Sequence, residues 1–250
     1  FRSDTSAQFG PLVKPIITPR FVPSCTSELM TGLAKLAKEY DVPVQSHLSE
    51  NHGEIDWVAS LHPESSNYTD VYYEHHLMGT VPTVMAHCIH LSDVEMDRMA
   101  ETQTMVSHCP YSNVNLSSGI APIRKLIERN IPIGLGSDIS GGHIVSMAKV
   151  LTEAIGLSKM KWAEVDPNYA PLTLSEAFYM ATKGGGQFFG HVGSFEKGYE
   201  LDALIIDDTS LFDPNERSLE ERLERWLYVG DDRHIIERYV AGRVVPSPKG

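Results

Sequence analysis

The chain has 250 residues, enough for one barrel-sized domain or two smaller ones, and its apolar fraction of 42% and charged fraction of 22% are ordinary for a globular protein. A net charge of -12 argues against the basic surface that a nucleic-acid-binding protein needs, so no nucleic-acid partner is expected. No apolar run reaches the length of a membrane-spanning helix and no signal-peptide pattern opens the chain, so no membrane association is expected either.

The three cysteines of the chain, Cys25, Cys88 and Cys109, are an odd number and form no CxxC pair. A disulfide framework is therefore not expected, and a reducing, cytoplasmic location is predicted. Cys88 and Cys109 each follow a histidine directly. We interpret both as small buried residues beside a site rather than as metal ligands.

The first third of the chain alternates predicted strands and helices. A strand is predicted at 13–18, where Pro19 ends it, and a second strand at 42–47. Leucines that recur at helical spacing predict a helix over 27–40, and apolar residues between 55 and 61 indicate another. The segment 62–73 is polar and rich in turn-forming residues, which predicts an insertion on the surface.

The middle third continues this alternation. Its predicted elements are a strand at 83–87, a helix opened by a capping box of Ser92 and Glu95 and running to 102, a strand at 104–107, a loop at 108–113, a helix at 122–129 and a strand at 131–136. Strands that alternate with helices at intervals of about 20 to 40 residues predict the parallel (β/α) barrel of the TIM type.

The pattern changes after Asp138. The predicted elements are helices at 147–157, at 173–180 and at 219–226, and strands at 203–206 and 239–245. We therefore expect residues 1–192 to form the later barrel strands with a helical cover, and residues 193–250 to return into a small β-sandwich domain. Only five barrel strands are predicted, whereas closure needs eight. Because the chain opens on Phe1 without a methionine, we expect the other strands on a preceding segment of the same protein.

Four predicted strands end in a residue that can bind a metal or transfer a proton. These residues are His47, His87, His108 and Asp138, and Glu50 follows His47 as the chain turns into a helix. A parallel barrel collects its strand ends at one face, so we expect these side chains to share a site.

His47 and Asp138 are the predicted metal ligands, because imidazole nitrogen and carboxylate oxygen are both ordinary zinc ligands. Taken singly, each could instead be a buried histidine or a helix-capping aspartate. Glu50 is the predicted general acid–base group, against the alternative of a first-turn glutamate favoured by the helix dipole. His87 could ligate the metal, orient the attacking hydroxide or polarise a substrate carbonyl, and the last two roles are favoured.

The remaining polar residues carry weaker signals. Arg20 and Phe21 offer a guanidinium and an aromatic face to a planar heterocycle, although the arginine could simply pair with a surface carboxylate. For His108, a supporting role beside the site and no role at all are equally expected. The other histidines lack a strand-end position and are interpreted as surface or structural residues: His52, His62, His75, His76, His90, His143, His191 and His234.

Several separate motifs resemble the amidohydrolase superfamily of metal-dependent hydrolases. They are QSHLSEN at 45–51, MAHC at 85–88, SHCPYSN at 107–113 and GLGSDISGG at 134–142, and the segment 193–208 is similar to that superfamily's return into its small β-domain. TPRF at 18–21 and LYVGDDR at 227–233 are similar to the branch that deaminates guanine.

The resemblance implies one zinc ion per active site, held in part by His47 and Asp138. It also implies that Glu50 carries protons and that His87 steers hydroxide and substrate. The purine would lie against Arg20 and Phe21 as well as these four residues, and the protein would form a homodimer.

The chain departs from the superfamily's pattern in one respect. The His-x-His pair that supplies two zinc ligands occurs nowhere in the 250 residues, so we expect it upstream, together with a glutamine that helps to recognise guanine. Two alternatives stay open. The protein could be another amidohydrolase acting on a pterin, a triazine or a nucleoside analogue, or a non-catalytic relative that serves as a scaffold.

Overall fold

The computed structural model describes residues 12–246, and residues 1–11 and 247–250 lie outside the described residues. No helix in the described range is long and apolar enough to cross a membrane. The chain divides into two units, each considered by itself. One contains the described residues up to His108 together with Leu116–Ile133, and the other contains Cys109–Asn115 together with the described residues from Gly134 on.

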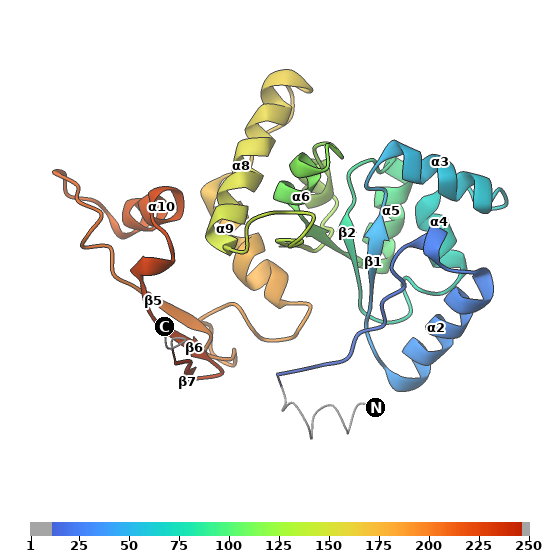
Figure 1. Ribbon diagram of the computed structural model, residues 1–250, viewed down its shortest axis with the longest axis horizontal. Helices are drawn as coiled ribbons and strands as arrows, with labels where there is room; N and C mark the ends of the chain where they lie inside the picture. Colours follow the sequence, from blue (N-terminus) through green and yellow to red (C-terminus); the bar gives the residue numbers. More distant parts are fainter. Residues whose placement is uncertain (1–11, 247–250) are drawn as a thin grey trace. The chain divides into compact units, whose positions relative to one another are not determined.

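The first unit alternates helices with parallel strands, as the sequence predicts. Its elements are the 3₁₀ turn η1 (Val22–Ser24), α2 (Ser27–Tyr40), β1 (Val44–Leu48), α3 (His52–Leu61), α4 (Tyr68–Glu74), β2 (Thr83–His87), α5 (Asp93–Thr102), β3 (Met105–His108), α7 (Ile123–Glu128) and the start of β4 (Ile133–Leu135). Helices α2, α3 and α4 gather beside β1 (Figure 1).

The strands form one sheet in the order β1-β2-β3-β4, in which β1 pairs with β2, and β2 with β3, in parallel. Alternate residues of β1 and of β2 are buried, as the two-residue period of a strand requires. In the register of these two strands, Leu48 lies opposite His87, so both strands end at the same level. The predicted mixed α/β fold with a parallel sheet is therefore confirmed.

The strand predicted at 13–18 is wrong in extent. Within that segment only Ile17 pairs, forming a single parallel bridge to Val44. Pro15 and Pro19 flank it, and proline has no N–H to donate to a sheet ladder, which limits the pairing to one residue.

The helices of this unit begin at side chains that satisfy their first N–H groups. Thr26 accepts a hydrogen bond from the Leu29 N–H at the start of α2. At the start of α5 the predicted capping box is reciprocal, since the Ser92 N–H donates to Glu95 Oε2 at 2.9 Å and the Glu95 N–H donates to Ser92 Oγ at 3.4 Å. The prediction of both helices is confirmed.

The surface insertion predicted at 62–73 is wrong, because part of it forms α4, whose Tyr68 and Tyr72 are buried. Their rings stack with centroids 5.6 Å apart. Each phenol also has a buried partner, and the Tyr68 hydroxyl donates to Glu54 Oε1 at 2.7 Å. A tyrosine whose hydroxyl is satisfied behaves as a core residue, which a count of polar residues misses.

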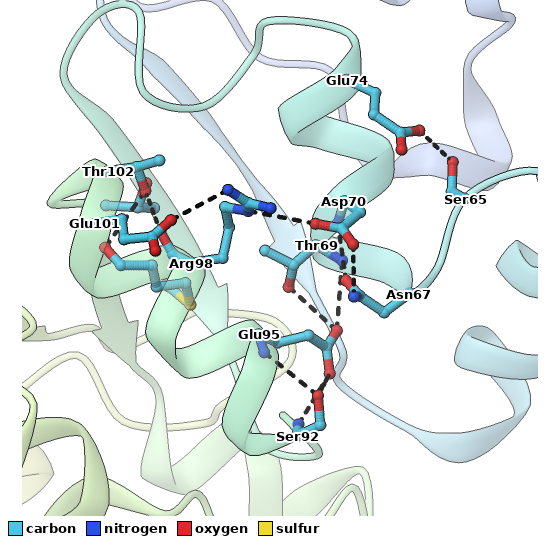
Figure 2. A network of polar contacts seen from close by, with 12 residues as sticks. Ser65, Asn67, Thr69, Asp70, Glu74, Ser92, Glu95, Arg98, Glu101 and Thr102 are labelled. Carbon is cyan, nitrogen blue, oxygen red and sulfur yellow. Dashed lines mark hydrogen bonds and ion pairs between the residues drawn. The ribbon is translucent and has the colours of Figure 1, made fainter.

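A polar network connects α4 to α5 (Figure 2). The buried Glu95 accepts a hydrogen bond from Thr69 Oγ1 at 3.1 Å through the oxygen that does not cap the helix. Arg98 donates to Asp70 at 3.4 Å and to Glu101 at 3.1 Å. Glu95 therefore fixes the start of α5 and holds α4 in place with the same carboxylate.

The second unit is mostly helical and ends in a small antiparallel sheet. Its elements are the rest of β4, α6 (Pro110–Asn115), α8 (Met147–Glu164), α9 (Leu174–Tyr179), the π-helical turn η2 (Met180–Gly184), β5 (Ala203–Ile206), α10 (Leu219–Val229), the 3₁₀ turn η3 (Asp232–His234), β6 (Ile235–Val240) and β7 (Arg243–Val244). Within this unit α8 packs against α6, α9 and α10, and the sheet order is β5-β6-β7.

Two predictions for this unit are wrong. The predicted loop at 108–113 contains α6, which begins at Pro110, because proline at the first helical position loses no hydrogen bond. The single strand predicted at 239–245 is a hairpin of β6 and β7. Ala241 and Gly242 both have positive φ, 47° and 73°, which is the backbone of a tight two-residue turn. The domain boundary expected at residue 193 stays a prediction.

Candidate active site

Three of the predicted site residues lie together at the ends of β1 and β2. The rings of His47 and His87 are stacked, with centroids 5.4 Å apart and planes inclined by 23°. Glu50, just past the end of β1, has its Oε2 atom 3.7 Å from His87 Nε2. The His87 side chain is 1% exposed and the Glu50 side chain 17%, so this carboxylate and this imidazole face each other with little solvent around them.

Three contacts fix the position of Glu50. Its backbone N–H donates to Glu54 Oε2 at 3.0 Å, and Glu54 is itself buried. The Ser118 hydroxyl donates to Glu50 Oε1 at 2.9 Å. The other carboxylate oxygen, Oε2, faces His87. The carboxylate therefore has one oxygen engaged by a neutral donor and one directed at the other predicted site residue.

The backbone is strained at these strand ends. Ser49 and His87 have φ of 50° and 70°, and Cys88, which follows His87, has φ of 52°. A residue other than glycine in this left-handed region costs about 1 to 2 kcal/mol. Such strain is retained where the surrounding structure needs it, and it clusters at functional sites. Here it turns the chain sharply after β1 and β2 and so sets where Glu50 and His87 point.

His47 has one ring nitrogen engaged and one left for a ligand. Its Nδ1 lies 2.6 Å from the Arg20 carbonyl oxygen. A carbonyl only accepts, so Nδ1 is the donor, and in the neutral form of the ring Nε2 is then the nitrogen with the lone pair. A hydrogen bond of this kind orients metal-binding histidines, so His47 fits a zinc ligand. Among residues 12–246, no group of three or more histidine, cysteine, aspartate or glutamate side chains is arranged to hold a metal ion.

Arg20 and Phe21 lie on the segment that leads to η1, and an additional aromatic residue lies beside them. The Arg20 guanidinium carbon is 5.6 Å from the centroid of the Phe21 ring. The Trp57 ring meets Phe21 edge-on, with centroids 6.2 Å apart, and Trp57 is 51% exposed. Trp57 was predicted only as part of a helix. The structure adds its edge-on contact with Phe21, which the sequence did not indicate.

His108 ends β3 and is buried. Burial, reinforced by the neighbouring His87, lowers the pKa of the His108 imidazole to about 3. Its Nδ1 has no hydrogen-bond partner within the described residues. The His108 side chain is therefore buried and neutral at ordinary pH. Its predicted supporting role stays a prediction.

Asp138 belongs to the second unit, so its proximity to His47 and His87 stays a prediction. It follows β4 and has φ of 43°, a third strained strand end. A side chain at Gly141 would place its Cβ 2.6 Å from Asp138 Oδ2 and from Ser112 Oγ. Glycine is therefore required at position 141 because the chain folds back directly over the Asp138 carboxylate.

The structure adds residues that the sequence did not indicate. His90 and His52, both predicted as surface or structural, have ring centroids 4.0 Å apart, and His90 Nε2 lies 2.8 Å from the Ser118 carbonyl oxygen. Glu54 and Ser118 both contact Glu50. Glu54 carries an ordinary helix-start pattern, and Ser118 lies 68 residues away from Glu50 in a loop without a motif, so neither could be found from the sequence.

Comparison with known proteins identifies the family of the chain. The model of the amidohydrolase family matches residues 6–245. A guanine deaminase of Dictyostelium discoideum is 45% identical over 246 residues, which is 96% of this chain and 54% of that protein. A solved structure of guanine deaminase from C. acetobutylicum, with bound guanine in its active site, is 52% identical with a TM-score of 0.92, covering 98% of this chain and 59% of that one.

A more distant structure shares the fold. An adenosine deaminase from Xanthomonas campestris with bound zinc is 21% identical, with a TM-score of 0.83 over 97% of this chain and 54% of that one. The chain thus spans about half the length of the relatives that it matches. Since the family model covers nearly every residue, the chain belongs to the amidohydrolase family.

Proposed function

We propose that the protein containing this chain is a zinc-dependent deaminase that hydrolyses guanine to xanthine and ammonia. The observation that carries the proposal is the group of His47, Glu50 and His87 at adjoining strand ends, with Glu50 Oε2 3.7 Å from His87 Nε2. The substrate follows from similarity, since relatives named guanine deaminase are 45% identical and, for a structure with guanine bound, 52% identical.

The metal would be held by His47 through Nε2 and by Asp138 through its carboxylate. When bound, zinc lowers the pKa of a water molecule toward neutrality and so makes hydroxide available as a nucleophile. A zinc site has four positions and a catalytic one keeps one of them open. The two ligands of this chain are therefore too few, and we propose that two further histidines come from residues outside it.

Glu50 would act as the proton carrier. Its Oε2 takes a proton from the attacking water and passes it to the ring nitrogen beside C2 of guanine, which makes C2 more electrophilic. After the oxygen has added to C2, Glu50 takes the remaining proton of that oxygen and delivers it to the amino group. The C2–N bond then breaks, the amino group leaves as ammonia and the added oxygen becomes the C2 carbonyl of xanthine. His87 donates from Nε2 to the oxygen that adds, and so orients it toward C2. The balance is guanine and water giving xanthine and ammonia.

Arg20 and Phe21 would bind the purine. The Phe21 ring offers a face for stacking, and the Arg20 guanidinium, 5.6 Å from that ring, can donate to the C6 oxygen of a stacked purine. The backbone carbonyl of the same arginine holds His47 at 2.6 Å. One residue would thus connect recognition of the substrate to the orientation of a zinc ligand.

The site also implies an architecture. We propose that the parallel strands β1 to β4 are consecutive strands of an eight-stranded (β/α) barrel, and that the antiparallel β5-β6-β7 sheet belongs to a small β-sandwich domain. Two observations support this: the parallel pairing of β1, β2 and β3, and the placement of the site residues at the carboxyl ends of those strands.

The test is a substrate comparison with the full-length protein. Ammonia release and xanthine formation would be measured with guanine, a pterin and a triazine, together with zinc content by elemental analysis. We expect stoichiometric zinc and a kcat/KM for guanine at least about a hundredfold above those of the other heterocycles. If the protein holds stoichiometric zinc but has a higher kcat/KM for the pterin or the triazine, it is an amidohydrolase with a different substrate. Absence of zinc and of turnover would indicate a scaffold.

A further inference from the structure

The two oxygens of the Glu50 carboxylate have different surroundings. Oε1 accepts a hydrogen bond from the Ser118 hydroxyl at 2.9 Å, whereas Oε2 faces His87 Nε2 at 3.7 Å. Ser118 is 7% exposed, so water does not readily compete for this bond. The contact joins the end of β1 to a loop that no motif identifies.

Ser118 is itself held in place by His90. The His90 Nε2 atom lies 2.8 Å from the Ser118 carbonyl oxygen and, because a carbonyl only accepts, Nε2 must donate. The His90 backbone N–H donates to the Ser49 carbonyl at 3.1 Å, one residue before Glu50. The chain therefore closes a loop of contacts in which Glu50, Ser118 and His90 fix one another.

The close approach of this loop depends on a glycine. Gly119 follows Ser118 with φ of 128°, a conformation that residues with a side chain rarely adopt. A Cβ at Gly119 would lie 3.1 Å from the Ile89 side chain and 3.3 Å from the His90 ring. The missing side chain lets the Ser118 carbonyl reach His90 Nε2.

We propose that Ser118 is a positioning residue that keeps Oε2 of Glu50 as the proton-accepting oxygen, and that His90 in turn positions Ser118. This inference rests on the proposed function, in which Glu50 carries protons. With Oε1 held, rotation of the carboxylate about its Cγ–Cδ bond is restricted, so Oε2 stays directed at the His87 side of the site. A group held in its reactive orientation does not have to be ordered during the reaction.

A hydroxyl donor suits a carboxylate that changes its protonation state. When Glu50 is ionised, Oε1 accepts from Ser118. When Oε2 has taken a proton, Oε1 is the carbonyl oxygen of the acid and still accepts from the same hydroxyl. Ser118 therefore keeps its bond through both states, and the carboxyl group need not reorient between accepting and delivering the proton.

The test compares variants of position 118 in the full-length, zinc-loaded protein. Ser118→Ala should lower kcat for guanine about tenfold, the order expected for a lost hydrogen bond to a charged group, with KM and zinc content nearly unchanged. Ser118→Thr keeps the hydroxyl and should retain most of the wild-type kcat. Ser118→Val has the shape of threonine but lacks the hydroxyl, so its kcat should be as low as that of Ser118→Ala. Ser117→Ala is the matched control, since Ser117 is the exposed neighbouring serine.

Combination with Glu50→Gln separates this inference from the proposed function. If Glu50→Gln lowers kcat by about 10² to 10⁴-fold and Ser118→Ala lowers this residual kcat no further, Ser118 acts through Glu50. If Glu50→Gln causes the same loss while the threonine and valine variants of Ser118 have equal kcat, the positioning role is wrong and the proposed function stands. If Glu50→Gln leaves kcat unchanged, the proton-carrier role and this inference fail together. Melting temperatures identify any variant that does not fold. If Ser118→Ala does not fold, the difference in kcat between Ser118→Thr and Ser118→Val decides whether the hydroxyl positions Glu50.

Discussion

Arg20 contacts two residues of the proposed site through two separate groups, one in the backbone and one in the side chain. Its carbonyl oxygen accepts from His47 Nδ1, and its guanidinium lies against the Phe21 ring. Truncation of the side chain leaves the backbone carbonyl in place. A variant at this position therefore tests the proposed purine recognition without removing the backbone partner of His47, the proposed zinc ligand.

Arg20→Ala should raise KM for guanine by about ten- to a hundredfold with a smaller change in kcat, because a charged donor to the C6 oxygen is lost. It should have little effect on 2-aminopurine, which lacks that oxygen, so the selectivity between the two purines should fall. Steady-state kinetics with both substrates, beside zinc content, provide the measurement. Equal losses for the two purines would show that Arg20 does not contact the C6 oxygen.

His108 gives the protein a pH-dependent stability. Its pKa is about 3 in the folded protein and 6.5 is the ordinary value, so between these values the unfolded chain binds a proton that the folded chain does not. The free energy of unfolding should therefore fall as the pH drops below about 6.5, by up to about 1.4 kcal/mol per pH unit from this group.

Replacement of the buried imidazole by an amide tests that dependence. His108→Asn should flatten the change in unfolding free energy between about pH 6 and pH 4, measured by urea titration, because asparagine does not titrate. The exposed His143→Asn is the matched control for the loss of one histidine. A His108→Asn protein with the wild-type pH dependence would contradict the neutral, buried imidazole.

At the scale of elements, α4 supports the strand that carries His47. The Tyr72 hydroxyl on this helix lies 2.7 Å from Ser46 Oγ and donates to the His47 carbonyl at 2.9 Å. Ser46 Oγ also lies 2.8 Å from the Pro19 carbonyl oxygen, so the single Ser46 proton is shared between that carbonyl and the Tyr72 oxygen. One buried phenol thus connects α4 to β1 and, through Ser46, to the segment that carries Arg20.

Tyr72→Phe should destabilise the protein by about 1 to 3 kcal/mol, because the His47 carbonyl loses its side-chain donor in a buried position. It should also weaken zinc retention, since β1 is no longer held at His47. Tyr73→Phe on the same helix removes an exposed hydroxyl and should change neither quantity. The urea midpoint of unfolding and the zinc content would be measured for both variants. Equal values for Tyr72→Phe and Tyr73→Phe would rule out the supporting role of α4.

An element could be predicted from the sequence when the residues that determine it lie within the element itself. Strand β2 at 83–87 and the capped helices α2 and α5 were predicted because spacing and caps lie within the segment itself. Helix α4 was missed because its tyrosines become core residues only through Glu54 and Ser46, which lie elsewhere in the chain. Its stability depends on tertiary hydrogen bonds that no local pattern contains.

For the whole molecule, the parallel order of strands could be predicted, and with it the meeting of His47, Glu50 and His87, because strand ends converge wherever the pairing is parallel. Ser118 could not, because its contact with Glu50 depends on how a loop is positioned by His90. The homodimer expected from the resemblance stays a prediction, which sedimentation of the purified protein would test.

The most direct test of the proposed deaminase is the turnover of Glu50→Gln in the full-length, zinc-loaded protein. Glutamine keeps the shape and the hydrogen bond from Ser118 but cannot take the proton of the attacking water. We predict a fall in kcat for guanine of about 10² to 10⁴-fold, with zinc content and guanine binding retained. A variant with full zinc and near-normal kcat would show that Glu50 is only a charge at the start of α3, and would contradict the account.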